Sequence, residues 1–199
     1  MDLAYQNSIV PVGVSPVCGL DEAGRGPLAG PVFAAAVILP EGLVIEGLDD
    51  SKKLSEKKRG ALEQIIKEKA LCWAVASADE KTIDEINILN ASLLAMKKAS
   101  LELSTVPALL LVDGNIARGF SYPAIPVVKG DARIPCIAAA SILAKTARDR
   151  YCLEMDRAYP QYGFAVHKGY PTKAHREAIR EYGPCPLHRK SFLKKILDQ

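Results

Sequence analysis

The stretch that decides the fold is VCGLDEAGRG, residues 17–26, in which an apolar run meets two acids and a glycine-rich turn. A similar pattern returns later, where the apolar residues 109–112 run into Asp113 and residues 125–128 precede Asp131. An α/β sheet places its ligands at the ends of its strands. Carboxylates gathered at such an edge repel one another, and hard divalent cations relieve that repulsion. The pattern therefore predicts a metal-dependent site that acts on a phosphate.

The adjacent acids Asp21 and Glu22 are expected to point to opposite faces of an extended backbone, unless the strand ends between them. One can then bind a metal directly while the other reaches a second metal or a bound water. Asp113 is the clearest single signal, although Asp-Gly also supplies ordinary turn chemistry. Asp131 is weaker, because a loop Asp before a helix can be a simple cap.

The glycine-rich turn Gly24-Arg25-Gly26 follows the first acids and is neither a dinucleotide fingerprint nor a Walker motif. Glycine lets backbone N–H groups approach a ligand closely, and the guanidinium of Arg25 suits phosphate. The alternative is a tight turn between two strands.

Two further segments combine cations with turn chemistry. The block DSKKL, residues 50–54, puts Lys52 and Lys53 either near a phosphate or at the start of the next helix. In HKGYP, residues 167–171, Tyr170 suits stacking on a nucleotide, although a tyrosine before proline is often simply packed.

Hydrophobic periodicity predicts a mixed α/β sheet, since paired strands come first and alternating elements follow. A capping box at Thr82 predicts the start of one helix, and two prolines put the last strand at an edge. Residues 1–16 are expected to form an arm, 17–160 the catalytic domain, and 161–199 a basic helical extension of the same domain. The expected strands are 17–20, 32–39, 71–78, 108–112 and 122–128, and the expected helices lie around 61–69, 82–101, 137–159 and 172–182.

Composition bounds the class of protein. With 199 residues, 49% hydrophobic and 25% charged, the chain is expected to fold as one globular domain. No apolar run approaches the ~20 residues of a membrane span, and the start lacks a signal peptide, so we expect no membrane partner and a cytoplasmic location. The five cysteines are odd in number and never spaced C-x-x-C, which argues against a zinc site or a disulfide framework.

Positive charge is concentrated at the C-terminal end. Residues 165–199 hold eight Lys or Arg against three acids, a net +5, whereas residues 1–164 carry −2. Such asymmetry favours a polyanionic partner, although a solvated basic helix is the alternative. Arg189 and Lys190 in this segment are expected to contact phosphate.

Taken together, six blocks of the chain occur in the order of the ribonuclease HII family and resemble its signatures. They span residues 17 to about 192, and residues 189–192 also resemble the bacterial members. The related type HIII enzymes carry an extra N-terminal domain, for which sixteen residues are too few, so type HII is expected. The blocks are residues 19–32, 50–54, 112–114, 128–131, 138–145 and 167–171.

This resemblance implies a ribonuclease H-like fold, a mixed five-stranded sheet flanked by helices with a C-terminal helical extension. It implies a monomeric endonuclease that uses two divalent cations, Mn²⁺ or Mg²⁺. The substrates would be RNA–DNA hybrids and duplex DNA with an embedded ribonucleotide, cut to leave a 3′-hydroxyl and a 5′-phosphate. Gly24, Arg25 and Gly26 match the motif that contacts the 2′-OH, and Tyr170 matches a tyrosine that packs on the sugar. The acids that match the family's metal site are Asp21, Glu22, Asp113 and Asp131.

Two other functions remain open on the residues alone. A nuclease of the same broad fold that acts on DNA would keep the acids without needing the glycine turn and Tyr170. A non-catalytic nucleic-acid-binding module would not need four acids, which oppose binding to a phosphate backbone.

Overall fold

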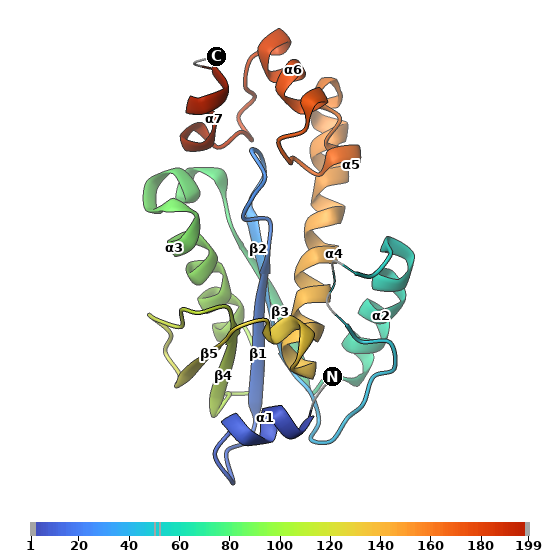
Figure 1. Cartoon of the computed structure of the whole chain (residues 1–199), viewed down its shortest axis with the longest axis vertical. Helices are drawn as coiled ribbons and strands as arrows, with labels where there is room; N and C mark the ends of the chain where they lie inside the picture. The colour runs from blue at the N-terminus through green and yellow to red at the C-terminus, as the bar shows by residue number, and fades with distance from the viewer. Residues whose placement is uncertain (1–2, 50, 52, 198–199) are drawn as a thin grey trace.

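A computed structural model describes residues 3–49, 51 and 53–197. Its centre is a five-stranded sheet in the order β3-β2-β1-β4-β5 (Figure 1). Strands β1, β2 and β3 are antiparallel, whereas β4 and β5 run parallel to β1. The mixed sheet and the edge position of the last strand are therefore confirmed. The strands are β1 Val17–Ala23, β2 Val32–Ile38, β3 Cys72–Ala78, β4 Leu109–Asp113 and β5 Ala124–Val127.

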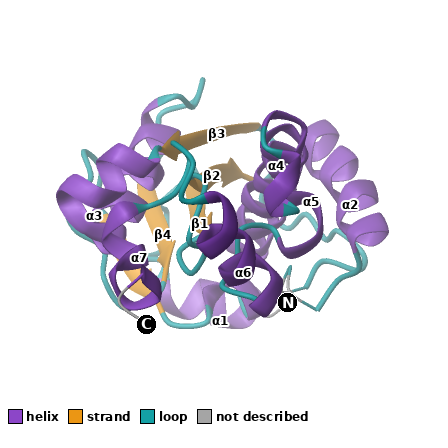
Figure 2. Cartoon of the chain, turned by 90° about the horizontal axis from the view of Figure 1, so that it is seen from above, coloured by secondary structure: helices purple, strands orange, loops and turns teal. Residues whose placement is uncertain are grey.

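Helices cover both faces of the sheet (Figure 2). Helix α3, Glu80–Leu101, packs on the face formed by residues such as Leu20 and Ala36. Helices α2, Glu56–Lys69, and α4, Pro135–Ala158, pack on the face that carries Ala35 and Val37. The two hydrophobic layers follow from the alternation of side chains along each strand.

Helix α4 approaches β1 very closely at its N-terminal end. A Cβ atom added to Gly19 would lie 2.2 Å from the backbone carbon of Cys136, so only glycine fits there. The buried Ala138-Ala139-Ala140 run continues this close contact along the sheet. Pro135 occupies the first turn, where its missing N–H costs no hydrogen bond. The helix thus begins beside the strand ends that carry the acids.

Helix α3 begins earlier than the capping box predicted. Its N-cap is Asp79, whose carboxylate accepts a hydrogen bond of 2.8 Å from the backbone N–H of Thr82. Asp is a better N-cap than Thr and stands three residues before it, so Asp79 takes that position. A second irregularity follows at Asn87, whose φ of 65° interrupts the helix.

The N-terminal segment, predicted as an arm without clear structure, contains helix α1, Leu3–Ile9. Tyr5 and Ile9 pack against a buried cluster that includes Leu109 and Ile137. The Tyr5 ring also lies 3.3 Å from the guanidinium carbon of Arg133. A helix of this length gives too weak a periodic signal to be predicted.

The C-terminal segments gather at one end of the molecule, at the top of Figure 1. Their core joins Phe164 and Ile179 to Leu28 and Met155, so the extension is packed on the turn between β1 and β2 and on α4. None of the helices in the described part of the chain has the length and apolar character that a membrane crossing requires. The elements here are the 3-10 turn η2 Pro160–Tyr162, and the helices α5 Phe164–His167, α6 Lys173–Tyr182 and α7 Lys190–Leu197.

Candidate active site

The parallel register of β1 and β4 brings two predicted acids together. Leu20 pairs with Val112, so Asp21 and Asp113 each directly follow a paired position. Asp21 shares its face of the strand with Gly19, and the α4 face of the sheet is therefore the one that carries the carboxylates. Asp113 ends β4, as predicted, whereas β1 continues two residues beyond Asp21.

Asp131 completes a cluster of carboxylates. It lies in the 3-10 turn η1, Gly130–Ala132, just before α4. The backbone N–H of Gly130 donates to Oδ1 of Asp113 over 2.7 Å, which holds this turn against the end of β4. One carboxylate oxygen each of Asp21, Asp113 and Asp131 lie within 4.8 Å of one another, a spacing that a single cation can bridge.

Glu22 is not one of these three acids, although its charge is close enough to raise the pKa of Asp21. Among the described residues the group of close carboxylates does not include it, because successive side chains of β1 point to opposite faces. Its Oε1 lies 3.4 Å from Nη1 of Arg25, and its side chain is largely buried. The extended backbone of β1 at Asp21 and Glu22 is the condition for the predicted divergence of their side chains, and a metal-binding role for Glu22 stays a prediction.

The electrostatics of the cluster disfavour three bare charges. Burial raises the pKa of Asp21 well above its usual range, and the neighbouring Glu22 and Asp113 raise it further. A hydrogen bond from Ser141 of α4 partly offsets this shift. Since Ser141 and Ser51 are 2.8 Å apart, a chain of hydroxyls connects the DSKKL loop to Asp21.

The donor set fits a hard divalent cation. All three close ligands are carboxylate oxygens, the type that Mg²⁺ and Mn²⁺ prefer. Asp21 and Asp131 are buried, so water screens their mutual repulsion poorly. A bound cation would offset the repulsion that raises the pKa of Asp21.

The predicted glycine turn lies directly after β1. Gly24 has a φ of +104°, which L side chains rarely adopt, and a Cβ atom there would lie 2.3 Å from Nε of Arg148. Arg25 and Gly26 are exposed. Gly24 comes three positions after Asp21, which is about 10 Å along an extended strand. The turn is therefore close enough to contact a ligand whose phosphate reaches the carboxylates.

Tyr170 lies against this turn. A Cβ atom on Gly26 would be 3.3 Å from the Tyr170 ring, and the residue Tyr170 is 44% exposed. The backbone N–H of Leu28 donates to the carbonyl of Gly169 over 2.8 Å, which joins the two loops. The structure thus brings Tyr170 and the glycine turn together, and Tyr170 stays partly exposed beside that turn.

Sequence reasoning missed Arg148 and assigned no role to Ser141. Arg148 is buried under the glycine turn, and its Nη2 donates to the carbonyl of Lys168 over 2.9 Å. Both residues belong to α4, and the sequence pattern predicts only that they lie on a helix. A polar residue on the apolar face that packs on the sheet was the available signal for Ser141.

Of the two lysines in the DSKKL segment, the structure describes only one. Lys52 lies outside the described residues. Lys53 is exposed, and its Nζ lies 3.3 Å from Oδ1 of Asp49. Of this segment, Ser51 and Leu54 are anchored, because Nη1 of Arg59 donates to their carbonyls. A contact of Lys53 with phosphate stays a prediction.

Arg189 and Lys190, predicted together, differ sharply. Lys190 is exposed, whereas Arg189 is completely buried and its guanidinium donates to three backbone carbonyls of the segment 24–30. Burial and the nearby Arg148 lower the pKa of Arg189 to about 9, which leaves it protonated at neutral pH. The expected phosphate contact does not fit Arg189, since no part of its side chain reaches the surface.

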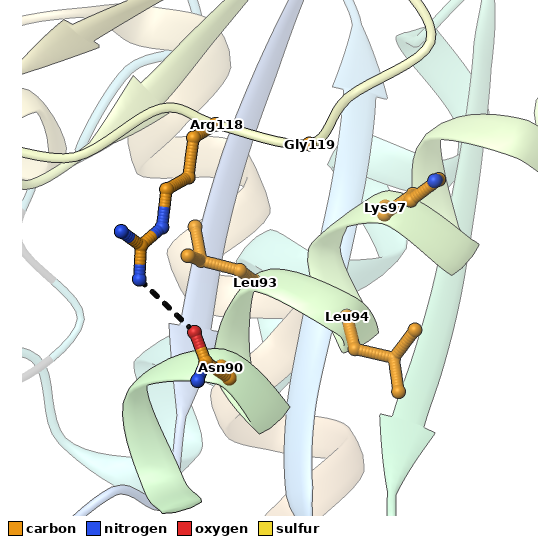
Figure 3. A pocket seen from close by; sticks show the side chains of 6 residues that line it. All are labelled: Asn90, Leu93, Leu94, Lys97, Arg118 and Gly119. Atoms are coloured by element: carbon orange, nitrogen blue, oxygen red, sulfur yellow. Dashed lines mark hydrogen bonds between the residues drawn. The ribbon is translucent and has the colours of Figure 1, made fainter. Parts of the chain in front are cut away.

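Two hollows lie away from the carboxylates. One, of about 310 Å³, lies between α3 and the loop after β4, where Nη2 of Arg118 donates to Asn90 over 3.2 Å (Figure 3). The other, of about 550 Å³, lies between the N-terminal segment and residues 39–43. Neither is lined by Asp21, Asp113 or Asp131. The carboxylates thus sit outside both hollows.

Known proteins resemble this chain in sequence and in fold. A relative from Dechloromonas aromatica (strain RCB), named ribonuclease HII, is 58% identical over 184 residues, which cover 92% of this chain and 93% of the relative. The crystal structure of ribonuclease H2 from Pyrococcus horikoshii OT3 matches with a TM-score of 0.76 at 28% identity, over 92% of this chain and 97% of that one.

A second structural match extends the likeness in fold. It is Bst-RNase HIII in complex with Mn²⁺, with a TM-score of 0.70 at 19% identity over 94% of this chain and 70% of that one. The family model described as Ribonuclease HII matches residues 18–195. The chain therefore belongs to the ribonuclease HII family, the type 2 ribonuclease H hydrolases.

Proposed function

We propose that the protein hydrolyses the RNA strand of RNA–DNA hybrids and cuts on the 5′ side of single ribonucleotides embedded in duplex DNA. The products are a 3′-hydroxyl and a 5′-phosphate. The observation that carries this function is the cluster of Asp21, Asp113 and Asp131, whose oxygens lie within 4.8 Å of one another beside an exposed glycine turn. The family supplies metal-dependent ribonuclease H activity, and the turn suggests how the ribose is selected.

Two divalent cations, Mg²⁺ or Mn²⁺, are the cofactors that fit this site. Asp21, Asp113 and Asp131 would hold them, with Glu22 reaching a second ion or a bound water. Such cations, when bound, lower the pKa of the attacking water and stabilise charge on the phosphate. The solved Bst-RNase HIII complex contains Mn²⁺, and its shared fold supports the same choice.

The reaction is an in-line displacement at phosphorus. The oxygen of a water forms the new P–O bond as the bond to the 3′-oxygen of the preceding nucleotide breaks. That 3′-oxygen takes up a proton, and the phosphate stays on the 5′ side of the ribonucleotide. The task of the chain is to hold the scissile phosphate in line, because small errors of position cost rate steeply.

Ribose selection falls to the glycine turn and Tyr170. A 2′-OH distinguishes RNA from DNA at a given site. Backbone N–H groups at Arg25 and Gly26 can approach it because no bulky side chain intervenes at Gly26. Tyr170, whose ring lies against Gly26, offers a flat apolar surface to the neighbouring sugar.

The enzyme acts as a monomer, since one chain supplies all three clustered carboxylates. The substrate duplex would be held through phosphate contacts by exposed cations such as Arg25, Lys53 and Lys190. The cytoplasm is the compartment that suits such an enzyme.

A cleavage assay tests this function. Three duplexes of one sequence are compared: all DNA, DNA with one ribonucleotide, and an RNA–DNA hybrid. We expect cleavage of the second and third only, with Mg²⁺ or Mn²⁺ present and none in EDTA. Equal cleavage of the all-DNA duplex would instead assign a DNA nuclease, and binding without metal-dependent turnover would assign a non-catalytic module.

A further inference from the structure

Arg189 is bonded to the glycine turn through its whole guanidinium group. Its Nη2 lies 2.7 Å from the carbonyl oxygens of both Gly24 and Gly30, and its Nη1 lies 3.0 Å from that of Arg25. Its Nε donates to Gly30 over 2.9 Å. A side chain that is fully buried and engaged on all three nitrogens cannot also contact a substrate phosphate.

These bonds set the direction of two amide groups. In a planar trans peptide the C=O and the following N–H point in opposite directions. Holding the carbonyl of Gly24 toward Arg189 therefore points the N–H of Arg25 away from it, and the carbonyl of Arg25 does the same for Gly26. Neither amide is among the donors of the loop hydrogen bonds found in the described residues.

The backbone around Arg189 fixes it in place. Its N–H donates to the carbonyl of Leu28 over 2.8 Å, and the preceding His188 forms a β-bridge with Ala29. On the other side, Asp84 of α3 accepts hydrogen bonds of 2.9 Å from the N–H groups of Lys190 and Ser191 at the start of α7. The residues on both sides of Arg189 are thus hydrogen-bonded to the hairpin and to α3.

The geometry of this contact requires arginine. A guanidinium has five N–H donors in a rigid planar fork, whereas a lysine ammonium is a single point on a flexible stem. A lysine keeps the charge but has no fixed fork of donors with which to hold the carbonyls of Gly24, Arg25 and Gly30 together. Charge and position can therefore be separated by experiment.

We propose that Arg189 is a positioning residue for the 2′-OH of the substrate, acting through the Gly24-Arg25-Gly26 turn that it holds. This role rests on the function proposed above. It gives the C-terminal extension a task besides attracting the phosphate backbone, which is to point the amides of Arg25 and Gly26 at the ribose.

The test compares Arg189→Lys with Arg157→Lys, the same substitution at an exposed arginine in the last turn of α4. Hydrogen exchange is first measured without substrate. We expect faster exchange of the amides in residues 24–30 in Arg189→Lys, with the strands β1 and β4 as protected as in Arg157→Lys. Exchange that accelerates equally in those strands would overturn the assignment, since it would mean a general loss of stability.

Steady-state cleavage of a duplex with one ribonucleotide is then measured. We expect kcat to fall roughly 10- to 100-fold in Arg189→Lys, the effect of a misplaced substrate, with KM and its salt dependence close to those of Arg157→Lys. A rise in KM with a smaller salt slope at unchanged kcat would show a direct phosphate contact and overturn the assignment. Arg189→Gln gives the same comparison if the lysine variant does not fold.

The two proposals fail differently. If the unaltered protein cleaves no ribose-containing duplex, the proposed function is wrong, whatever the exchange data show. If it cleaves normally while Arg189→Lys keeps both its protected turn and its kcat, only the positioning role of Arg189 is wrong.

Discussion

The carboxylate cluster and the glycine turn lie three residues apart on β1 and its hairpin. The charges of the cluster face one another, whereas the charge beneath the turn is hydrogen-bonded within the chain. In the cluster, Asp21, Asp113 and Asp131 bring like charges within 4.8 Å. Beneath the turn, the guanidinium of Arg189 finds several carbonyl acceptors within the chain. The three carboxylates need a cation to offset their repulsion, whereas the hydrogen bonds of Arg189 to the turn are formed without any ligand. The difference separates the part that binds cations from the part that is prearranged for the ribose.

This contrast has an energetic consequence for mutation. Removing one carboxylate from the cluster relieves repulsion, so the fold should not lose stability. Removing the side chain of Arg189 leaves buried carbonyls without donors, which costs roughly 1–3 kcal/mol for each such group. A substitution in the carboxylate cluster should therefore cost activity but not stability, whereas loss of the Arg189 side chain should cost stability.

The largest expected effect is that of Asp113→Asn on cleavage. Replacing a charged ligand by an amide should weaken cation binding and raise the barrier by several kcal/mol, on the order of 10³-fold in rate. The melting temperature without metal should stay equal or rise. Glu41→Gln, at an exposed acid after β2, is the matched control and should cleave normally.

A second prediction concerns acid pH and the loop that carries Tyr170. Burial lowers the pKa of both His175 and His188 to about 4. His175 Nδ1 donates to the carbonyl of Tyr170, its Nε2 meets Nε2 of His188 at 3.1 Å, and the ring of His167 stacks on it. Each neutral ring thus has a fixed hydrogen-bonding role. His188 in turn can accept from the N–H of Cys185 at Nδ1.

Because the unfolded chain takes up these protons near pH 6.5 and the native one only near pH 4, stability falls as pH drops between these values. By pH 4 we expect a loss of roughly 3 kcal/mol for each of the two histidines, about a hundredfold in the folding equilibrium for each. Urea unfolding across this range measures it. The variant His175→Gln/His188→Gln should show a flatter profile, and an identical profile would contradict the assignment.

Tyr170→Ala should reduce kcat on a single embedded ribonucleotide by roughly tenfold to a hundredfold, because the ring positions the sugar beside the scissile phosphate. Binding should weaken less than that, within the ~1–3 kcal/mol of lost stacking. Tyr182→Ala, at another exposed tyrosine, is the control. A fall in melting temperature with equal losses on every substrate would show instead that Tyr170 only orders its loop.

The smallest expected effect is that of Lys190→Ala. This exposed cation can contact one phosphate, so the slope of log affinity against log salt should shrink by about one unit, with the cleavage position unchanged. Binding measured by fluorescence anisotropy at several salt concentrations checks this. An unchanged slope would make Lys190 part of a solvated face.

The strands of the sheet and the chemistry of the acids at their ends could be predicted from the sequence. Apolar runs that end in Asp21 and Asp113 predicted the two strands, and their residue types predicted the chemistry. The pairing of β1 with β4 could not be derived, because it joins segments about ninety residues apart through tertiary packing. That pairing is what turns two separate acids into one cluster.

The burial of charge was also beyond sequence reasoning. Arg189 and Lys190 are adjacent and both carry a positive charge. Only the packing of the extension on Leu28 and Ala29 makes one of them buried and leaves the other exposed. Arg148 lies on a helix whose periodicity says nothing about the glycine turn above it. The start of α3 was misplaced because Asp79 and Thr82 both satisfy the rules for a helix cap.

The most direct test of the carboxylate cluster is a titration with Mn²⁺, followed by electron paramagnetic resonance, of the unaltered protein and of Asp113→Asn. We expect the unaltered protein to bind Mn²⁺ and Asp113→Asn to bind it more weakly. Substitution of a residue that only supports a metal ligand typically lowers affinity roughly 10- to 100-fold, and the loss of a ligand itself should cost at least as much. Equal affinity in the two proteins would contradict the assignment of this cluster as the metal site.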